Sequence, residues 1–287
     1  MSTSNFGAGA TLRRSWGSRL FGSELGLVLR RRRNIVMVVG LAAVPVVVAI
    51  VLRVVNPPAG ADDGPPSFIT QVTSNGLFLG FAALVIVTPF LMPLTMSVVS
   101  GDSIAGEASQ GTLRYLLTAP VARGRVLAVK YVAGVVYGLV ASVVVAAVGL
   151  AVGALLFPVR RITLLSGVTI PLPETLGRAL LMALYATVLM AGFIAIGLFV
   201  STLTEVPIAA MAATAALPVV AQILGAIPQL SGLHPWLFTD TWVAYGDFLR
   251  DPITWDTITR GVLTQAGYAA VFLSLAWARL TSRDITS

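Results

Sequence analysis

The ionisable side chains that could act together gather in residues 101–130, GDSIAGEASQGTLRYLLTAPVARGRVLAVK. Six of them are charged, namely Asp102, Glu107, Arg114, Arg123, Arg125 and Lys130. Carboxylates and guanidinium groups in this arrangement cap helices and make charge-assisted contacts with a partner. The stretch therefore indicates recognition rather than covalent chemistry, which needs a nucleophile held beside a base.

Few residues elsewhere in the chain could serve in catalysis or bind a metal. Cysteine is absent and His234 is the single histidine, which excludes thiolate nucleophiles and leaves no histidine cluster for a metal. The sequence contains no G-x-x-x-x-G-K-[ST], no H-E-x-x-H and no G-x-S-x-G. We expect no catalytic residue, no cofactor-binding residue and no metal site on this chain, and no P-loop ATPase activity.

Composition places the chain in a membrane. Of its 287 residues, 56% are hydrophobic and 11% are charged, against about 25% charged in soluble domains. A net charge of +7 could indicate that the protein binds nucleic acid. The positive charges, however, lie beside apolar runs, where they set topology. The prediction is an all-α polytopic membrane protein that binds lipid and no nucleic acid.

Six apolar runs are long enough to cross a bilayer as helices. They form one membrane domain, residues 34–279, after an N-terminal segment (1–33) and before a short tail (280–287). A polar loop (101–130) and an external segment (228–256) interrupt it. The expected spans are residues 34–55, 76–99, 131–157, 176–202, 207–227 and 257–277.

The N-terminal segment contains a candidate amphipathic helix in residues 19–33. At 100° per residue, Phe21, Leu25 and Val28 fall on one face, and four arginines, Arg30 to Arg33, crowd its end. Such a helix would lie along the membrane surface. The alternative is a basic cluster that sets topology and has no partner.

Span two contains Pro89 and Pro93, each of which removes a backbone donor and clashes with the preceding turn. Span five contains Pro218 and Gln222. A kink or local unwinding is expected at the first pair. These residues are candidates for a pathway or a hinge, and a span that is kinked for structural reasons alone is an equal alternative.

Two external segments carry turn and helix signals. Residues 158–174 predict a short hairpin around Ser166-Gly167. In residues 228–256, aromatic side chains recur at near-helical spacing, which predicts an aromatic-rich helix at the outer membrane interface or a re-entrant piece. They are Phe238, Trp242, Tyr245 and Phe248, with Trp236 and Trp255 nearby.

An even number of spans puts both termini on one side, and the basic residues indicate which. The terminal side holds Arg13, Arg14, Arg19, Arg30 to Arg33, Arg114, Arg123, Arg125, Lys130, Arg279 and Arg283; the other side holds Arg53, Arg160, Arg161, Arg178, Arg250 and Arg260. The excess of about two to one predicts cytoplasmic termini and a cytoplasmic 101–130 loop.

Local signals divide the loop into two short helices. Residues 103–110 can form the first, with Asp102 at its positive N-terminus and Gly111 at its end. Thr112 can cap the second, residues 113–118, which Pro120 stops. Arg114 and Tyr115 would then face a partner. The loop is either a docking element or a solvated connection.

The spacing Asp102-x-x-Ala105-x-Glu107-x-x-x-Gly111-Thr112-x-x-x-Leu116-Leu117-x-x-Pro120-x-x-Arg123, with Lys130 opening a span, resembles the cytoplasmic loop of type-2 ATP-binding-cassette (ABC) transporter permeases. The likeness is to the branch of small six-span exporters. The tail, Arg279-Leu280-Thr281-Ser282-Arg283-Asp284-Ile285, also resembles that family's ending. The topology match covers nearly the whole chain, and the motif match about 30 residues plus the tail.

That resemblance implies a coupling helix that docks on a separate ATPase subunit, which the N-terminal helix also touches. Glu107, Gly111, Thr112, Arg114 and Pro120 carry over as coupling residues, and Asp102 and Tyr115 join them by position. It implies two ATPase copies that bind ATP and Mg, a second permease (the same chain or a homologue) and a bacterial plasma membrane.

Two other function classes stay open. An ion-coupled secondary transporter or channel would work without an ATPase, although the middles of the spans lack charged residues. A membrane scaffold would transport nothing. The apolar lining of the spans favours export of an apolar or amphipathic compound, such as a lipid, a peptide antibiotic or a drug.

Overall fold

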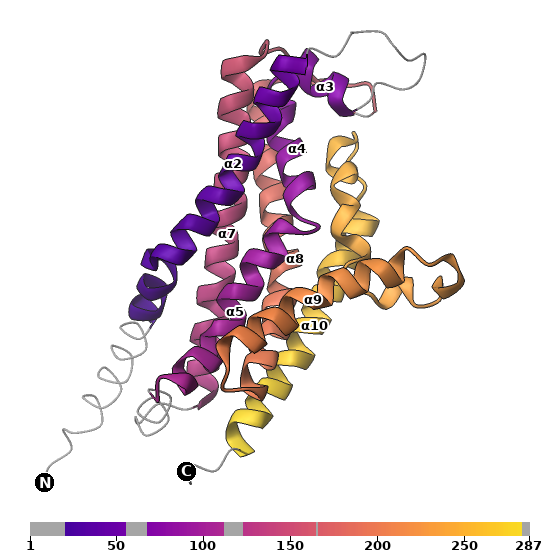
Figure 1. The fold of residues 1–287 in the computed structure, drawn as a ribbon. Helices are drawn as coiled ribbons and strands as arrows, with labels where there is room; N and C mark the ends of the chain where they lie inside the picture. The colour runs from indigo at the N-terminus through magenta and orange to yellow at the C-terminus, as the bar shows by residue number, and fades with distance from the viewer. Residues whose placement is uncertain (1–20, 56–67, 112–122, 165, 283–287) are drawn as a thin grey trace, which may run out of the picture.

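The chain folds as a helical bundle with a small hairpin and short 3-10 helices (Figure 1). The computed structural model describes residues 21–55, 68–111, 123–164 and 166–282. Within them, five helices are long and apolar enough to cross a membrane, and a bent helix pair makes a sixth candidate span. The predicted all-α membrane architecture is confirmed.

Each predicted span corresponds to a helix or helix pair. These are α2 (Arg32–Val55), the pair α4 (Phe78–Val87) and α5 (Leu91–Ser109), α7 (Arg123–Leu156), α8 (Leu172–Leu203), α9 (Pro207–Gly225) and α10 (Trp255–Ser282). Several exceed the apolar run that predicted them. The 34 residues of α7 rise about 51 Å at 1.5 Å each. A hydrocarbon core is about 30 Å thick, so the polar turns of α7 extend beyond it.

The helix boundaries follow local chemistry. Helix α8 begins after Pro171 and has Glu174 in its first turn, where a carboxylate favours the positive end of the helix. Helix α9 begins at Pro207, which needs no amide partner there. The short α3 (Phe68–Ser74) precedes span two.

Helix α8 is the centre of the bundle and packs against α5, α7 and α10. In the most apolar 18-residue stretch of α8, 72% of the residues are buried, against 17% in the corresponding stretches of α2 and α10. Its core side chains include Leu189, Met190 and Phe193, all fully buried. The outer helices therefore present most of their surface to their surroundings.

Glycines bring α7 into backbone contact with α4 and with the turn before it. A Cβ on Gly153 would lie 1.9 Å from the carbonyl oxygen of Gly76, and a Cβ on Gly149 would lie 2.8 Å from the Cα of Gly80. Small residues allow such close approach between membrane helices. Gly134 of α7 makes room for α8 in the same way, since a Cβ there would lie 3.0 Å from the Ile194 side chain.

Both described ends of the chain lie at one end of the bundle, which we call the terminal end. Figure 1 shows residues 21–30 and the last turns of α10 there, with α3 at the opposite end. Residues 21–30 are helical, as predicted, and we call them the N-terminal helix. It ends before Arg31, and Arg32 and Arg33, which were predicted to belong to it, are the first residues of α2. Whether this end faces the cytoplasm stays a prediction.

The polar loop is shorter than predicted. Residues 101–109 are the last turns of α5, and residues 123–130 are the first turns of α7. Asp102 is therefore inside a continuous helix and does not begin one, because Gly101 did not interrupt the backbone pattern. Gly111, with φ of +69°, follows the helix end as predicted. The second predicted helix, residues 113–118, lies outside the described residues, as do residues 283–287.

The segment after α9 is a series of 3-10 helices: η1 (Pro228–Leu230), η2 (His234–Trp236) and η3 (Asp240–Leu249). Its central rings point into the bundle, since Trp242, Tyr245 and Phe248 are at most 2% exposed. The 3.0-residue turn of a 3-10 helix puts all three on one inward face, so they pack against the protein and present no exposed aromatic face. Whether the segment lies at the outer interface or re-enters the membrane stays a prediction. Trp236 and Trp255 do remain exposed.

The predicted hairpin is present. Strand β1 (Ile162–Thr163) pairs antiparallel with β2 (Thr169–Ile170), with Ile162 opposite Ile170. Gly167 has φ of +81°, a left-handed conformation that glycine adopts without steric cost. Ile162 and Ile170 are buried in the core.

Candidate functional site

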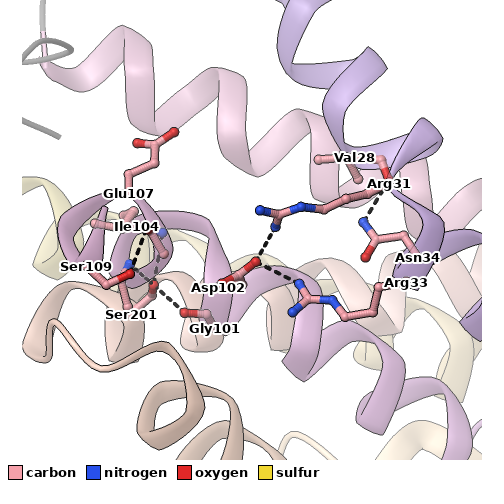
Figure 2. A network of polar contacts seen from close by, with 12 residues as sticks. Val28, Arg31, Arg33, Asn34, Gly101, Asp102, Ile104, Glu107, Ser109 and Ser201 are labelled. Carbon is pink, nitrogen blue, oxygen red and sulfur yellow. Dashed lines mark hydrogen bonds and ion pairs between the residues drawn. The ribbon is translucent and has the colours of Figure 1, made fainter. Parts of the chain in front are cut away.

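Six charged residues meet at the terminal end, and we call them the terminal charge cluster: Glu24, Arg31, Arg33, Asp102, Glu107 and Lys130. Asp102 accepts hydrogen bonds from both Arg31 and Arg33, the latter at 2.7 Å. Figure 2 shows the two guanidinium groups directed at the same carboxylate, while Glu107 points away from it. The start of span one is thereby joined to the end of span two.

Lys130 provides the second half of the cluster. Its side chain is 4% exposed, and its Nζ lies 2.6 Å from Glu107 and 3.4 Å from Glu24. Burying an ammonium group is costly without such partners. Lys130 therefore ties α7 both to α5 and to the N-terminal helix.

The N-terminal helix and α2 meet at an interruption at Arg31. The carbonyl of Arg31 accepts from the backbone of Asn34 at 2.9 Å, and the Asn34 side chain donates to the Val28 carbonyl at 2.7 Å. These bonds satisfy backbone groups that the break exposes. Phe21, Leu25 and Val28 are half-buried, and their position at a membrane surface stays a prediction.

Helix α8 is hydrogen-bonded to α5 at Gly101, the residue before Asp102 of the terminal charge cluster. The Ser201 hydroxyl donates to the Gly101 carbonyl at 2.6 Å and accepts from the backbone N–H of Ala105 at 2.9 Å. In an α-helix these two backbone groups bond to each other. Gly101 also leaves room for α9, since a Cβ there would lie 2.8 Å from the backbone nitrogen of Met211. Three helices are thus fixed around Gly101.

Span two breaks where prolines were predicted to break it. Helices α4 and α5 differ in direction by 55°. Pro93 has no N–H to give the carbonyl of Pro89, its partner in a regular helix. The Gln222 side chain of α9 supplies that donor, at 2.7 Å. Two residues proposed separately from the sequence therefore act on one break.

A second contact holds the break from η3. The Tyr245 hydroxyl lies 2.8 Å from the Thr88 hydroxyl, which itself donates to the Leu84 carbonyl. Burial raises the pKa of the Tyr245 hydroxyl above its usual value. The break is therefore defined by contacts and is not a loose joint.

The segment that carries Tyr245 is anchored to α8 and α10. Arg178 donates to the carbonyls of Phe248 and Arg250, at 2.8 and 2.6 Å. Tyr185 and Gln265 donate to the carbonyls of Thr241 and Phe238. These four carbonyls lie at or near the two ends of η3, so the donors of α8 and α10 fix η3 against the spans.

The predicted coupling residues are only partly described. Asp102, Glu107 and Gly111 lie at the end of α5, and the first two belong to the terminal charge cluster. Thr112, Arg114, Tyr115 and Pro120 lie outside the described residues. Of the predicted hinge residues, Pro89 and Gln222 are in contact. Pro93 and Pro218 are buried elsewhere on α5 and α9.

Sequence reasoning missed the pairing partners. Arg31 and Arg33 had been assigned to topology, and Glu24 and Ser201 to nothing. One signal was available, because Lys130 is the chain's only lysine and stands at the start of a span. Among the described residues, no three carboxylate or imidazole side chains gather as a metal site would need.

Comparison with known families agrees with this architecture. The family described as ABC-2 family transporter protein matches residues 56–234, which include the broken span, the connection to α7 and α9. The chain belongs to the ABC-2 transporter family. It is therefore a membrane permease component of an ABC-2 type transporter, and that family works with an ABC ATPase. A search of curated proteins gave no match. The arginines of this permease that bind Asp102 lie before the matched region.

Proposed function

We propose that this ABC-2 permease exports an apolar or amphipathic compound, driven by ATP hydrolysis on a separate ATPase subunit docked at residues 101–120. Two ATPase copies bind ATP and Mg, and a second permease, the same chain or a homologue, completes the transporter. It works in a bacterial plasma membrane with both termini in the cytoplasm. The substrate class rests on the apolar spans.

The observation that carries the proposal is the pairing of Asp102 and Glu107 with residues of other segments. Both carboxylates lie in the last turns of α5, next to the connection where a partner would dock. A force applied there acts on the N-terminal helix through Arg31 and on α7 through Lys130. It also acts along α5 to the 55° break, where a helix can change direction.

The test reconstitutes the permease with a candidate ATPase in proteoliposomes and measures ATP hydrolysis and complex formation. Glu107→Ala removes the closest partner of Lys130, and we expect weaker coupling, seen as less ATPase stimulation by the permease. Replacing residues 111–118 with a Gly/Ser sequence should abolish docking. Asp256→Asn, an exposed change at the start of α10, is the matched control.

Unchanged docking and unchanged ATPase activity in both altered proteins would contradict the coupling role. Transport that follows an ion gradient with no ATPase present would instead indicate a secondary transporter or channel. An intact complex that moves no compound would indicate a scaffold.

A further inference from the structure

A cavity of about 240 Å³ lies inside the terminal charge cluster. Its walls come from the N-terminal helix, α2, α5, α7 and α8. One part of the lining is charged and includes Arg31, Arg33 and Glu24. The other is apolar and includes Val28, Val99, Ile194 and Leu198. The lining therefore suits a ligand that has a polar group next to an apolar group.

The arginine side of the cavity has capacity for an anion. Arg31 and Arg33 converge on a single carboxylate, Asp102, so these three residues together carry one net positive charge. Each guanidinium has five N–H donors, and each donates one hydrogen bond to Asp102. The remaining donors match a phosphate, which arginine binds in a planar, bidentate manner.

The same cavity also holds acceptors for a hydrogen-bond donor. The Asn34 side-chain oxygen is buried and has no hydrogen-bond partner, in a residue that is 3% exposed. Figure 2 shows the Asn34 side chain beside both arginines. Glu24 is 12% exposed, and its contacts with Lys130 are long, at 3.4 Å. Such acceptors favour a cation that carries N–H groups.

The depth of the cavity indicates where such a ligand comes from. Its charged residues stand at the polar ends of the apolar runs: Arg33 directly precedes span one, Asp102 follows Val99 of span two, and Lys130 precedes span three. Residues at this position lie at the level of lipid headgroups. At about 30 Å³ per water, the cavity holds about eight waters. It is smaller than the ~300–1,000 Å³ typical of drug-sized ligands.

We propose that this cavity binds the headgroup of a zwitterionic phospholipid that carries a primary ammonium, as phosphatidylethanolamine does. Arg31 and Arg33 hold its phosphate, and Glu24 and the Asn34 side-chain oxygen accept from its ammonium. The acyl chains remain in the bilayer beside the N-terminal helix. This site belongs to the permease alone and does not depend on the proposed ATPase.

The unchanged protein provides the first test. The purified, delipidated full chain is titrated by native mass spectrometry with phosphatidylethanolamine, phosphatidylcholine and phosphatidylglycerol of identical acyl chains. We expect the ethanolamine lipid to bind about tenfold more tightly than either other lipid, because the choline group has no N–H to donate and the glycerol group has no cation. Equal affinity for all three would overturn the proposal.

Variants assign the two halves of the site. Glu24→Gln should lower the affinity for phosphatidylethanolamine about tenfold and leave phosphatidylglycerol unchanged. Arg33→Gln should lower the affinity for all three lipids. Asp256→Asn and Arg260→Gln, at the start of α10, are the matched controls and should bind as the unchanged protein does. Equal loss for every lipid in Glu24→Gln would contradict the assigned orientation.

A soluble headgroup separates the two possible sources of this chemistry. Glycerophosphoethanolamine should compete only weakly, because it lacks the chains that hold the lipid in place. If it binds as tightly as the lipid does, the ligand is a soluble phosphate-amine and the lipid assignment is wrong.

Discussion

The side-chain amide of Gln222 donates a 2.7 Å hydrogen bond to the carbonyl oxygen of Pro89, in the break of span two. In a regular helix that carbonyl would accept from residue 93, which is a proline. Helix α9 therefore replaces a bond that the sequence of span two has removed. Within a membrane span, no water is present to do the same.

We first predict that the cost of losing Gln222 depends on Pro93. Gln222→Leu should lower the free energy of unfolding by about 1–3 kcal/mol, because the Pro89 carbonyl loses its donor. In a Pro93→Ala background the helix regains its own N–H, and the same change should cost less than about 0.5 kcal/mol. Thermal unfolding of the four proteins in detergent gives this double-mutant cycle. Additive effects would show that Gln222 does not act through Pro89.

A second prediction concerns the hydroxyl of Tyr245. Tyr245→Phe removes the contact with Thr88 but keeps the ring against Tyr185, 5.8 Å away between centroids. We expect a loss of about 1 kcal/mol in stability. Tyr245→Ala should cost about 3–5 kcal/mol, because it also leaves a cavity. Thermal unfolding measures both, and equal losses would mean that the hydroxyl, rather than the ring, accounts for the effect.

A third prediction concerns Ser201. Ser201→Ala removes the hydroxyl that joins α8 to the Gly101 carbonyl, and α5 can then form its own bond between Gly101 and Ala105. We expect a loss of about 1 kcal/mol in the free energy of unfolding, measured in detergent.

Ser97→Ala is the matched control for Ser201. Ser97 is equally buried, but its hydroxyl bonds the Leu94 carbonyl within its own helix. Its loss should be nearly neutral. If both substitutions lower the free energy of unfolding equally, the hydrogen bonds between α8 and α5 contribute nothing to stability beyond burial.

A fourth prediction tests the contact between α7 and the turn that precedes α4. Gly153→Ala should destabilise the protein by about 3 kcal/mol or more, because the added methyl would meet the backbone of Gly76, which cannot move aside as a side chain could. Gly177→Ala on α8, where nothing lies within 4 Å of an added Cβ, should be neutral or slightly stabilising. Expression and thermal stability of the two variants check this, and similar values would contradict the close contact.

Local features were predictable from the sequence. The six apolar runs, the prolines of span two, Pro207 at the start of α9 and Gly111 after α5 each act through the backbone of their own neighbourhood. A single sequence contains that information. The polar ends of the spans were harder, because α5 and α7 continue into polar residues that pack at the terminal end.

Contacts between distant segments were not predictable. Arg31 lies 71 residues from Asp102, and nothing in either neighbourhood specifies the other. The inward rings of η3 were missed for a related reason. A spacing of three to four residues fits both helix types, so periodicity alone does not distinguish them. The donors that hold the segment, including Arg178 and Gln265, belong to α8 and α10.

The two contacts at the break of span two also impose an order in time. Gln222 and Tyr245 follow their partners by 133 and 157 residues. At ~5–20 residues per second, roughly 7–27 s of synthesis separate Pro89 from Gln222. Span two therefore enters the membrane before either residue exists. Its bent shape can be completed only once the chain has been made as far as Tyr245.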